Sequence, residues 1–268
     1  TAKSILKLSL ERSFLLLFAK HPMSISVCMA TYNGAAYVLK QLKSILVQLD
    51  PEDEVIVVDD CSTDKTVETI RSIGDPRISL HQNDRNCGEV HSFSRAISLA
   101  RNDYIFLSDQ DDIWIAKRAE LMTRKLAESG CWVVSSNLAW VDAQETNIDV
   151  PYDGVATANS RKHLSNITDI FIGKTNYFGC AMAIRREIIP MVVPIPNFVE
   201  SHDLWIALAS NLAQSNLHID EATLLKRKHG RNATSTVSTR SLLRKFWSRV
   251  IFALSLLVLI GRLRLVAR

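Results

Sequence analysis

The stretch EVIVVDDCSTDKT, residues 54 to 66, joins an apolar run to an acidic turn and the start of a helix. Residues 54 to 58 are rich in valine and isoleucine and bounded by turn residues, as expected of a strand buried on both faces. Ser62, Thr63 and Asp64 are residue types that cap a first helical turn, and helical spacing continues from residue 65 to residue 73. The stretch therefore predicts strand, acidic loop and helix, the repeating unit of a parallel α/β sheet.

The same unit occurs on both sides of this stretch. Apolar runs predict strands at residues 25–30, 78–81 and 104–107, and helical spacing predicts helices at 37–49 and 90–100. Alternation of this kind predicts an α/β fold: a mostly parallel, Rossmann-like nucleotide-binding sheet with helices on both faces.

The pattern is weaker beyond Cys131. It predicts a strand or strand pair at 131–142, a loop at 146–160, a strand at 180–184 and a helix at 203–213. We expect an N-terminal basic and apolar extension at 1–22, one domain at 23–239 with a nucleotide-binding half (23–130) and an acceptor half (131–239), and a basic amphipathic segment at 240–268.

Charge is distributed unevenly along the chain. The net charge is +4, but residues 240 to 268 hold seven basic and no acidic residues, and residues 1 to 22 carry a net +3. The intervening 217 residues are therefore acidic, with a net charge of −6. An acidic body with basic ends argues against a nucleic-acid surface and favours local contact with an anionic surface.

The cysteines and the N-terminal apolar run bear on the compartment. Five cysteines, an odd number, never show the spacing of a metal-ligand pair, so we expect reduced thiols in a cytosolic protein. The apolar run 14–19 is short and is followed by Lys20, His21 and Pro22, so a cleaved signal peptide is not expected.

Three polar motifs follow predicted strands, namely TYNG (31–34), DDCSTD (59–64) and SDQDD (108–112). Ligands of parallel sheets bind beyond the carboxyl ends of the strands, so the motifs should share one rim. Neighbouring carboxylates repel each other and need a cation or water, and Mg²⁺ or Mn²⁺ prefers carboxylate and phosphate oxygens. Asp109 and Asp111 thus suggest a metal that bridges to a diphosphate. Enrichment of Asp at a helix start explains Asp111 and Asp112 about as well.

Six segments of the chain together resemble one enzyme family. They are SVCMATYNG (26–34), EVIVVDDCSTDKT (54–66), NCG (86–88), ARNDYIFLSDQDDIW (100–114), SHDLWIAL (201–208) and RKHGRNAT (227–234). In this order and spacing they resemble the family 2 glycosyltransferases of the GT-A fold, across residues 23 to 232. The DQDDIW variant is similar to bacterial enzymes that build cell-surface polysaccharides, including rhamnosyltransferase-like members.

The resemblance implies roles for residues of the first half. Tyr32 would stack on or flank the donor base, with a turn aromatic as the alternative. Asp60 would bind the base or ribose, and Asp59 would be structural or share that role. Asp109 would meet the ribose or the metal, and Asp111 would ligate the metal.

The remaining assignments from the resemblance are less specific. Asp112 is expected to cap a helix beginning near Trp114. Arg85 and Arg95 are candidates for approaching the donor, with a solvated position as the better-supported alternative.

In the second half the resemblance implies a base that takes a proton from the acceptor hydroxyl. Asp203 in ESHDLW is our candidate, with Glu200 less favoured and an N-cap role as the alternative for Asp203. Relatives show Glu-Asp here, whereas this chain has His202 before Asp203. His229 in KHGRNAT would lie near the diphosphate or metal, and Asn232 is a weaker candidate.

The implied activity is inverting, metal-dependent transfer of a sugar from a UDP-, dTDP- or GDP-linked donor to an acceptor glycan, as in O-antigen or capsule synthesis. The cofactor would be Mg²⁺ or Mn²⁺. The acceptor would be lipid-linked, with undecaprenyl diphosphate as one option, and no nucleic acid is expected to bind.

The C-terminal segment bears on location. Residues 250 to 261 are twelve uncharged, mostly apolar residues between Arg249 and Arg262. A helix of that length covers roughly 18 Å of a hydrocarbon core about 30 Å thick. We therefore expect this helix to lie on the cytoplasmic membrane face, with Arg244, Lys245, Arg249, Arg262 and Arg264 toward headgroups. Packing on the domain or on a partner chain is the alternative.

Two other function classes remain. A nucleotidyltransferase would show a Gly-rich, basic phosphate loop after the first strand, but ATYNGAAY has one Gly and no Arg or Lys. A nucleotide-sugar-binding module without turnover is the other. Replacing Asp203 separates that module from an enzyme.

Overall fold

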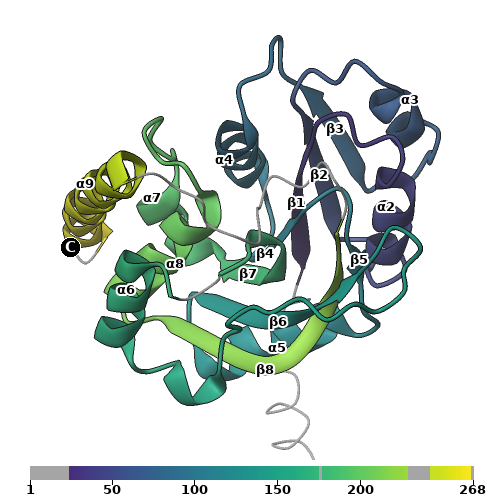
Figure 1. Ribbon diagram of the computed structural model, residues 1–268. Helices are drawn as coiled ribbons and strands as arrows, with labels where there is room; N and C mark the ends of the chain where they lie inside the picture. The colour runs from purple at the N-terminus through teal and green to yellow at the C-terminus, as the bar shows by residue number, and fades with distance from the viewer. Residues whose placement is uncertain (1–23, 175–176, 229–241, 267–268) are drawn as a thin grey trace, which may run out of the picture.

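The computed structural model describes residues 24–174, 177–228 and 242–266, without the side chains of 242–245. The described residues form one eight-stranded sheet in the order β3-β2-β1-β4-β7-β6-β8-β5 (Figure 1). The strands are β1 (Ile25–Thr31), β2 (Glu54–Asp59), β3 (Ile78–Gln82), β4 (Tyr104–Ser108), β5 (Ile113–Trp114), β6 (Val133–Val141), β7 (Met182–Arg185) and β8 (Asn216–Arg227).

The first half of the chain is the predicted parallel sheet. Strands β3, β2, β1 and β4 pair in parallel, with Cys28 opposite Ile56 on one side and Leu107 on the other. The connecting helices are α2 (Val38–Leu46), α3 (Thr66–Arg71) and α4 (Glu89–Leu99), followed by α5 (Arg118–Ser129). The predicted strands and helices are confirmed, with ends that differ by up to three residues.

Helices cover both faces of this half, as predicted. Side chains alternate across a strand, so Cys28 packs under α4 with Phe93 and Ile97, whereas Val27 and Met29 pack against the opposite helices. Strands β1, β2 and β4 are mostly apolar because both of their faces are buried, whereas the edge strand β3 is only partly buried.

The second half departs from a uniform parallel sheet. Strand β7 pairs antiparallel with both β4 and β6, β6 pairs parallel with β8, and β8 pairs antiparallel with β5. Residues 131–142 supply one strand, and residues 179–181 form a 3-10 turn before β7. The helices here are α6 (His163–Ile172), α7 (Ile189–Val192) and α8 (His202–Leu212), with 3-10 turns at Thr157–Asn159 and Arg186–Ile188.

The C-terminal helix α9 (Leu242–Val266) has 25 residues, about twice the apolar run used to predict it. It lies against α7 and α8. Leu259 is fully buried, and Arg262 donates to Met191 O at 3.1 Å and Pro194 O at 2.7 Å. Packing on the domain, the alternative at the sequence level, is therefore correct for one face of α9. Among the described helices, none is long and apolar enough to cross a membrane.

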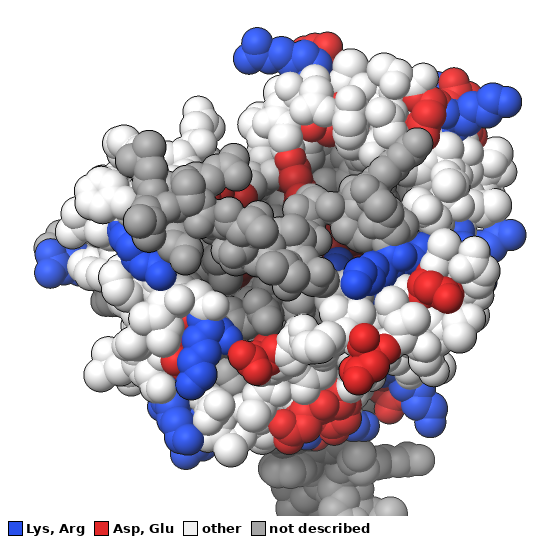
Figure 2. Space-filling model, viewed as in Figure 1, with Lys and Arg blue, Asp and Glu red and all other residues white. Residues whose placement is uncertain are grey.

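The expected orientation of the basic side chains on α9, toward headgroups, is wrong for Arg262. Arg262 faces the domain and lies over the Trp205 ring, and Arg249 lies over the Phe171 ring. Arg264 is exposed, and the side chains of Arg244 and Lys245 lie outside the described residues. On the described part of the face in Figure 2, Lys and Arg are scattered and do not form one broad basic area.

Candidate active site

Hydrogen bonds join the loop after β1 to the acidic turn after β4. Gln110 accepts from Tyr32 N at 2.9 Å and donates to Tyr32 O at 3.0 Å. A Cβ on Gly34 would lie 2.0 Å from Gln110 Oε1, so glycine is required for this contact. Tyr32 itself remains 46% exposed. The acidic turn thus fixes the backbone of Tyr32 and leaves its ring accessible.

The loops after β1 and β2 are joined in the same way. Asn33 N donates to Ser62 Oγ at 2.9 Å, and Asn33 Oδ1 accepts from Thr63 N at 2.8 Å. Asp59 is buried and accepts from Thr31 Oγ1 and from Ser62 N. The predicted convergence of the three motifs on one rim is therefore observed, and Asp59 has a structural position there.

Asp60 fixes the segment before α4. Its Oδ1 accepts from Cys87 N at 2.8 Å and Asn83 Nδ2 at 2.7 Å, and its Oδ2 accepts from Gly88 N at 2.7 Å. Arg95 donates to Asn83 Oδ1 at 2.6 Å, so this arginine supports the Asp60 network. Asp60 is 3% exposed, and its carboxylate shapes the corner in which the donor nucleoside was expected.

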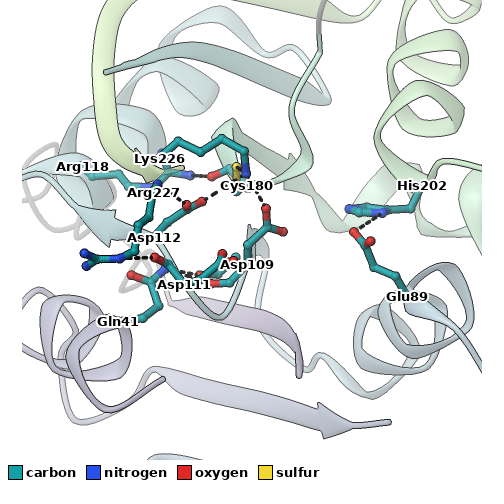
Figure 3. Close-up of polar contacts among 11 residues, drawn as sticks. Gln41, Glu89, Asp109, Asp111, Asp112, Arg118, Cys180, His202, Lys226 and Arg227 are labelled. Carbon is teal, nitrogen blue, oxygen red and sulfur yellow. Dashed lines mark hydrogen bonds and ion pairs between the residues drawn. The ribbon is translucent and has the colours of Figure 1, made fainter. Parts of the chain in front are cut away.

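Lys226, on strand β8, lies against the acidic turn. Its Nζ is 2.9 Å from Asp109 Oδ2, 3.7 Å from Asp112 Oδ2 and 3.5 Å from Cys180 Sγ (Figure 3). Burial alone would raise the pKa of Asp109, but the Lys226 ammonium lowers it below its ordinary value. The pKa of Lys226 lies well above its ordinary value because the charges of Asp109 and Asp112 outweigh burial. Lys226 thus compensates part of the negative charge of SDQDD.

Asp112 does not cap a helix, contrary to the sequence-based expectation. The residues after it form strand β5, and α5 begins at Arg118. Asp112 is 1% exposed, accepts from Arg227 N at 3.2 Å and faces Lys226. Burial raises its pKa to about 7 despite Lys226. Asp112 therefore connects the acidic turn to strand β8.

The side chains near this turn differ in their fit to a divalent cation. Ligand atoms of Asp109, Asp112 and Cys180 lie within 4.8 Å of one another. Lys226 contacts all three, however, and burial raises the pKa of the Cys180 thiol well above its ordinary value, so that thiol stays protonated. Mg²⁺ requires oxygen ligands. Asp109 and Asp111, both partly exposed, fit a hard cation better than Asp112 and Cys180.

The candidate base lies at the start of α8. Ser201 caps this helix by accepting from Leu204 N, so the N-cap role considered for Asp203 belongs to Ser201. Asp203 is partly exposed in the first turn, and its Oδ1 accepts from Leu204 N at 2.9 Å and from the Ser201 hydroxyl. No described residue donates a hydrogen bond to its Oδ2. Glu200 is exposed.

His202 and Glu89 connect α8 to α4. His202 Nδ1 lies 3.4 Å from Glu89 Oε1, and its ring stacks on Phe93 with centroids 4.0 Å apart. Burial raises the pKa of Glu89, the His202 charge opposes this, and the charges of Asp109 and Asp203 raise it further. The starts of α4 and α8 therefore lie beside the acidic turn.

Three residues of the site were not predicted from the sequence: Gln110, Lys226 and Glu89. Gln110 lies inside a motif that drew attention only for its aspartates, and Lys226 reads as part of an exposed basic run, KRK. Only the pairing of β8 beside the turn reveals the contact of Lys226 with Asp109. Arg85 is exposed, and His229 and Asn232 lie outside the described residues.

A family model supplies the decisive comparison. The model described as "Glycosyl transferase family 2" matches residues 26–190, which include β1 to β7 and the rim. The chain belongs to glycosyl transferase family 2. That membership agrees with the resemblance identified from the motifs.

Two relatives and one solved structure are similar to this family 2 chain. The dTDP-rhamnosyl transferase RfbG of Shigella flexneri is 28% identical over 76% of this chain and 72% of its own length. The UDP-Glc:alpha-D-GlcNAc-diphosphoundecaprenol beta-1,3-glucosyltransferase WfgD of Escherichia coli is 32% identical over 36% of this chain and 38% of its own. S. aureus TarS 1–349 in complex with UDP-GlcNAc matches with TM-score 0.65 and 20% identity, over 90% of this chain and 72% of TarS.

The TarS likeness shows the fold alone, and the fold is GT-A. Four further curated relatives of this family 2 chain align over only 33% to 54% of their own lengths. All five cysteines are free thiols, as expected.

Proposed function

We propose that this protein is an inverting glycosyltransferase that moves a sugar from a nucleotide-diphosphate sugar to a hydroxyl of an acceptor glycan in bacterial surface-polysaccharide synthesis. One observation carries the proposal. In a family 2 chain, hydrogen bonds join the loops after β1, β2 and β4 into one rim, with the start of α8 beside its acidic turn.

The donor nucleoside would bind between the loops after β1 and β2. The exposed Tyr32 ring, with its backbone fixed by Gln110, suits stacking on a base. Asp60 orients the backbone of residues 87 and 88 at the same corner, and Asp59 supports the loop beneath it. The names of RfbG and WfgD, and the TarS complex, favour a dTDP- or UDP-linked donor over a GDP-linked one.

Asp109 and Asp111 would hold a divalent cation, Mg²⁺ or Mn²⁺, against the diphosphate. The cation supplies Lewis-acid stabilisation of the negative charge on the departing nucleoside diphosphate. Lys226 keeps Asp109 ionised and fixes one of its oxygens. Residues near 229 were also expected at this point and lie outside the described part of the chain.

Asp203 would act as the base. As the acceptor oxygen bonds to the anomeric carbon, the bond from that carbon to the diphosphate oxygen breaks, and the hydroxyl proton passes to the carboxylate of Asp203. Direct displacement of this kind inverts the anomeric centre. The bonds from Leu204 N and Ser201 to Oδ1 hold Asp203 in one orientation.

The acceptor would be lipid-linked and the enzyme peripheral on the cytoplasmic membrane face. Helix α9 supports this because one of its faces is apolar and exposed: Phe246, Trp247, Leu254, Leu257 and Leu265 are each at least 43% exposed. At 3.6 residues per turn they share one face, roughly opposite the buried Ser255 and Leu259 and the partly buried Arg262. An exposed apolar stripe of this kind suits the bilayer interface. The name of WfgD supports a diphosphoundecaprenol-linked acceptor.

A panel of nucleotide sugars tests the proposed function. Binding of UDP-glucose, dTDP-rhamnose and GDP-mannose is measured by calorimetry with Mg²⁺, with Mn²⁺ and with chelator, and release of the nucleoside diphosphate is followed in parallel. We expect cation-dependent binding of at least one donor. Absence of binding to every donor under all three conditions would contradict the proposal.

A further inference from the structure

The carboxylate of Glu89 lies in the candidate active site but has no role in the reaction proposed above. It is the first residue of α4 and follows Gly88, whose N–H is bonded to Asp60. Its side chain is 47% exposed, whereas that of its partner His202 is 5% exposed. A half-exposed carboxylate next to a buried imidazole has one side free to meet a ligand and the other side fixed.

His202 is held in a single orientation. Its ring stacks on Phe93, and a Cβ on Gly179 would come within 2.3 Å of its Nε2, so only glycine leaves room for it. Nε2 is buried and has no hydrogen-bond partner among the described residues. A buried polar atom without a partner costs free energy and needs a reason. The contact of Nδ1 with Glu89 gives that reason, because the rigid imidazole fixes the carboxylate in space (Figure 3).

The surroundings of Glu89 define what it can meet. The charges of Asp109 and Asp203 both raise its pKa, so both carboxylates lie within electrostatic reach. In the proposed reaction the diphosphate lies at Asp109 and Asp111, and the acceptor hydroxyl lies at Asp203. Displacement at the anomeric carbon requires the donor sugar between these two points. Glu89 contacts His202, the residue before Asp203, and therefore borders that space on the side of Asp203.

We propose that Glu89, oriented by His202, accepts hydrogen bonds from hydroxyl groups of the donor sugar and makes the site selective for neutral over acidic sugars. This inference rests on the proposed function. A carboxylate accepts hydrogen bonds from hydroxyls strongly, because hydrogen bonds to ionised groups are about twice as strong as neutral ones. A sugar that carries its own carboxylate would instead be repelled by Glu89, Asp109 and Asp203.

The test compares Glu89→Gln with the wild type in calorimetric binding of two ligands, in the presence of Mg²⁺. One is the nucleotide sugar that the wild type binds most tightly, and the other is the matching nucleoside diphosphate without sugar. We expect affinity for the nucleotide sugar to fall about 10- to 100-fold, the loss of a hydrogen bond to a charged group, and affinity for the diphosphate to change less than about twofold. Glu68→Gln, at an exposed carboxylate on α3, is the matched control and should bind both ligands as the wild type does.

A second comparison tests the charge selectivity and the role of His202. We expect the wild type to prefer UDP-glucose over UDP-glucuronate and Glu89→Gln to narrow that preference. His202→Gln should also lower the affinity for the nucleotide sugar. The double variant should bind that sugar no more weakly than Glu89→Gln alone, because His202 acts through Glu89. Thermal midpoints of all variants establish that they are folded.

The outcomes separate this inference from the proposed function. Suppose that the wild type binds a nucleotide sugar. If Glu89→Gln binds it equally well, or loses affinity for the nucleotide sugar and for the diphosphate to the same extent, the role proposed for Glu89 is wrong, whereas the proposed function stands. If the wild type binds no nucleotide sugar, both fall together.

Discussion

At the scale of single residues, Lys226 is the side chain on which the acidic turn depends. Its ammonium is buried and lies against Asp109 and Asp112. Removing one partner from a buried ion pair typically costs about 3 to 5 kcal/mol, because the remaining charge is left uncompensated. The turn after β4 is therefore held by a cation that belongs to the protein.

Lys226→Met should lower the free energy of unfolding by about 3 to 5 kcal/mol, measured by urea denaturation at pH 7. The exposed neighbour Lys228 offers a matched control, and Lys228→Met should change stability by less than about 0.5 kcal/mol. Adding Asp112→Asn to Lys226→Met should recover part of the loss. Equal stabilities of Lys226→Met and Lys228→Met would show that the ion pair does not matter.

The residue scale also shows what the sequence could and could not predict. The motifs led to Tyr32, Asp60 and Asp109 because each follows a strand of a parallel sheet, whose rim is known in advance. Asp112 was misassigned because cap propensity is local, whereas its partners Lys226 and Arg227 are more than 100 residues away in sequence. No periodicity of the sequence encodes that contact.

At the scale of elements, α9 combines two faces with different roles. Arg262 and Leu259 fasten one face to α7 and α8, and the other exposes Leu254, Leu257 and Leu265. The apolar run predicted a helix, but the packing of that helix depends on α7 and α8, which lie elsewhere in the sequence. Burial of one face explains why a segment this apolar can belong to the domain.

Leu254→Glu together with Leu257→Glu should weaken binding to vesicles of mixed neutral and anionic lipid at least tenfold in co-sedimentation. Both side chains are exposed, so the thermal midpoint should stay close to that of the wild type. Val47→Glu introduces one glutamate at another exposed apolar position, the C-cap of α2, and is the control for a surface apolar-to-acidic change. Equal vesicle binding by all three proteins would exclude this face of α9 as the membrane contact.

At the scale of the whole molecule, the two halves of the sheet differ in how far the sequence predicts them. Strands β1 to β4 follow one another in regular α/β units, and their parallel order follows from the hand and length of the connections. Strands β5 to β8 form both parallel and antiparallel pairs. Their order in the sheet depends on contacts between segments far apart in sequence, which local patterns do not predict.

The stability of the second half should depend on pH through His218. This histidine is 1% exposed and lies 2.8 Å from Tyr177 Oη and 3.0 Å from Asn216 Nδ2. Burial lowers its pKa from 6.5 to about 4, so the fold holds it neutral. Its contribution is fully present above pH 6.5 and is lost as pH falls toward 4, in total about 3 kcal/mol.

Denaturation between pH 7 and pH 4.5 measures this dependence. The free energy of unfolding should decline across that range in the wild type and decline less in His218→Gln, which keeps a hydrogen-bonding side chain without the titration. Parallel profiles for the two proteins would contradict the assignment to His218.

We propose that this family 2 chain transfers a sugar with Asp203 as the base, and Asp203→Asn should therefore separate sugar transfer from donor binding. Transfer to a glycan acceptor should fall about 10²- to 10⁴-fold, the range for loss of a general base, while cation-dependent donor binding stays within about twofold of the wild type. Glu200→Gln, at an exposed neighbouring carboxylate, should retain both. If Asp203→Asn transfers sugar at the rate of the wild type, the account of catalysis is wrong.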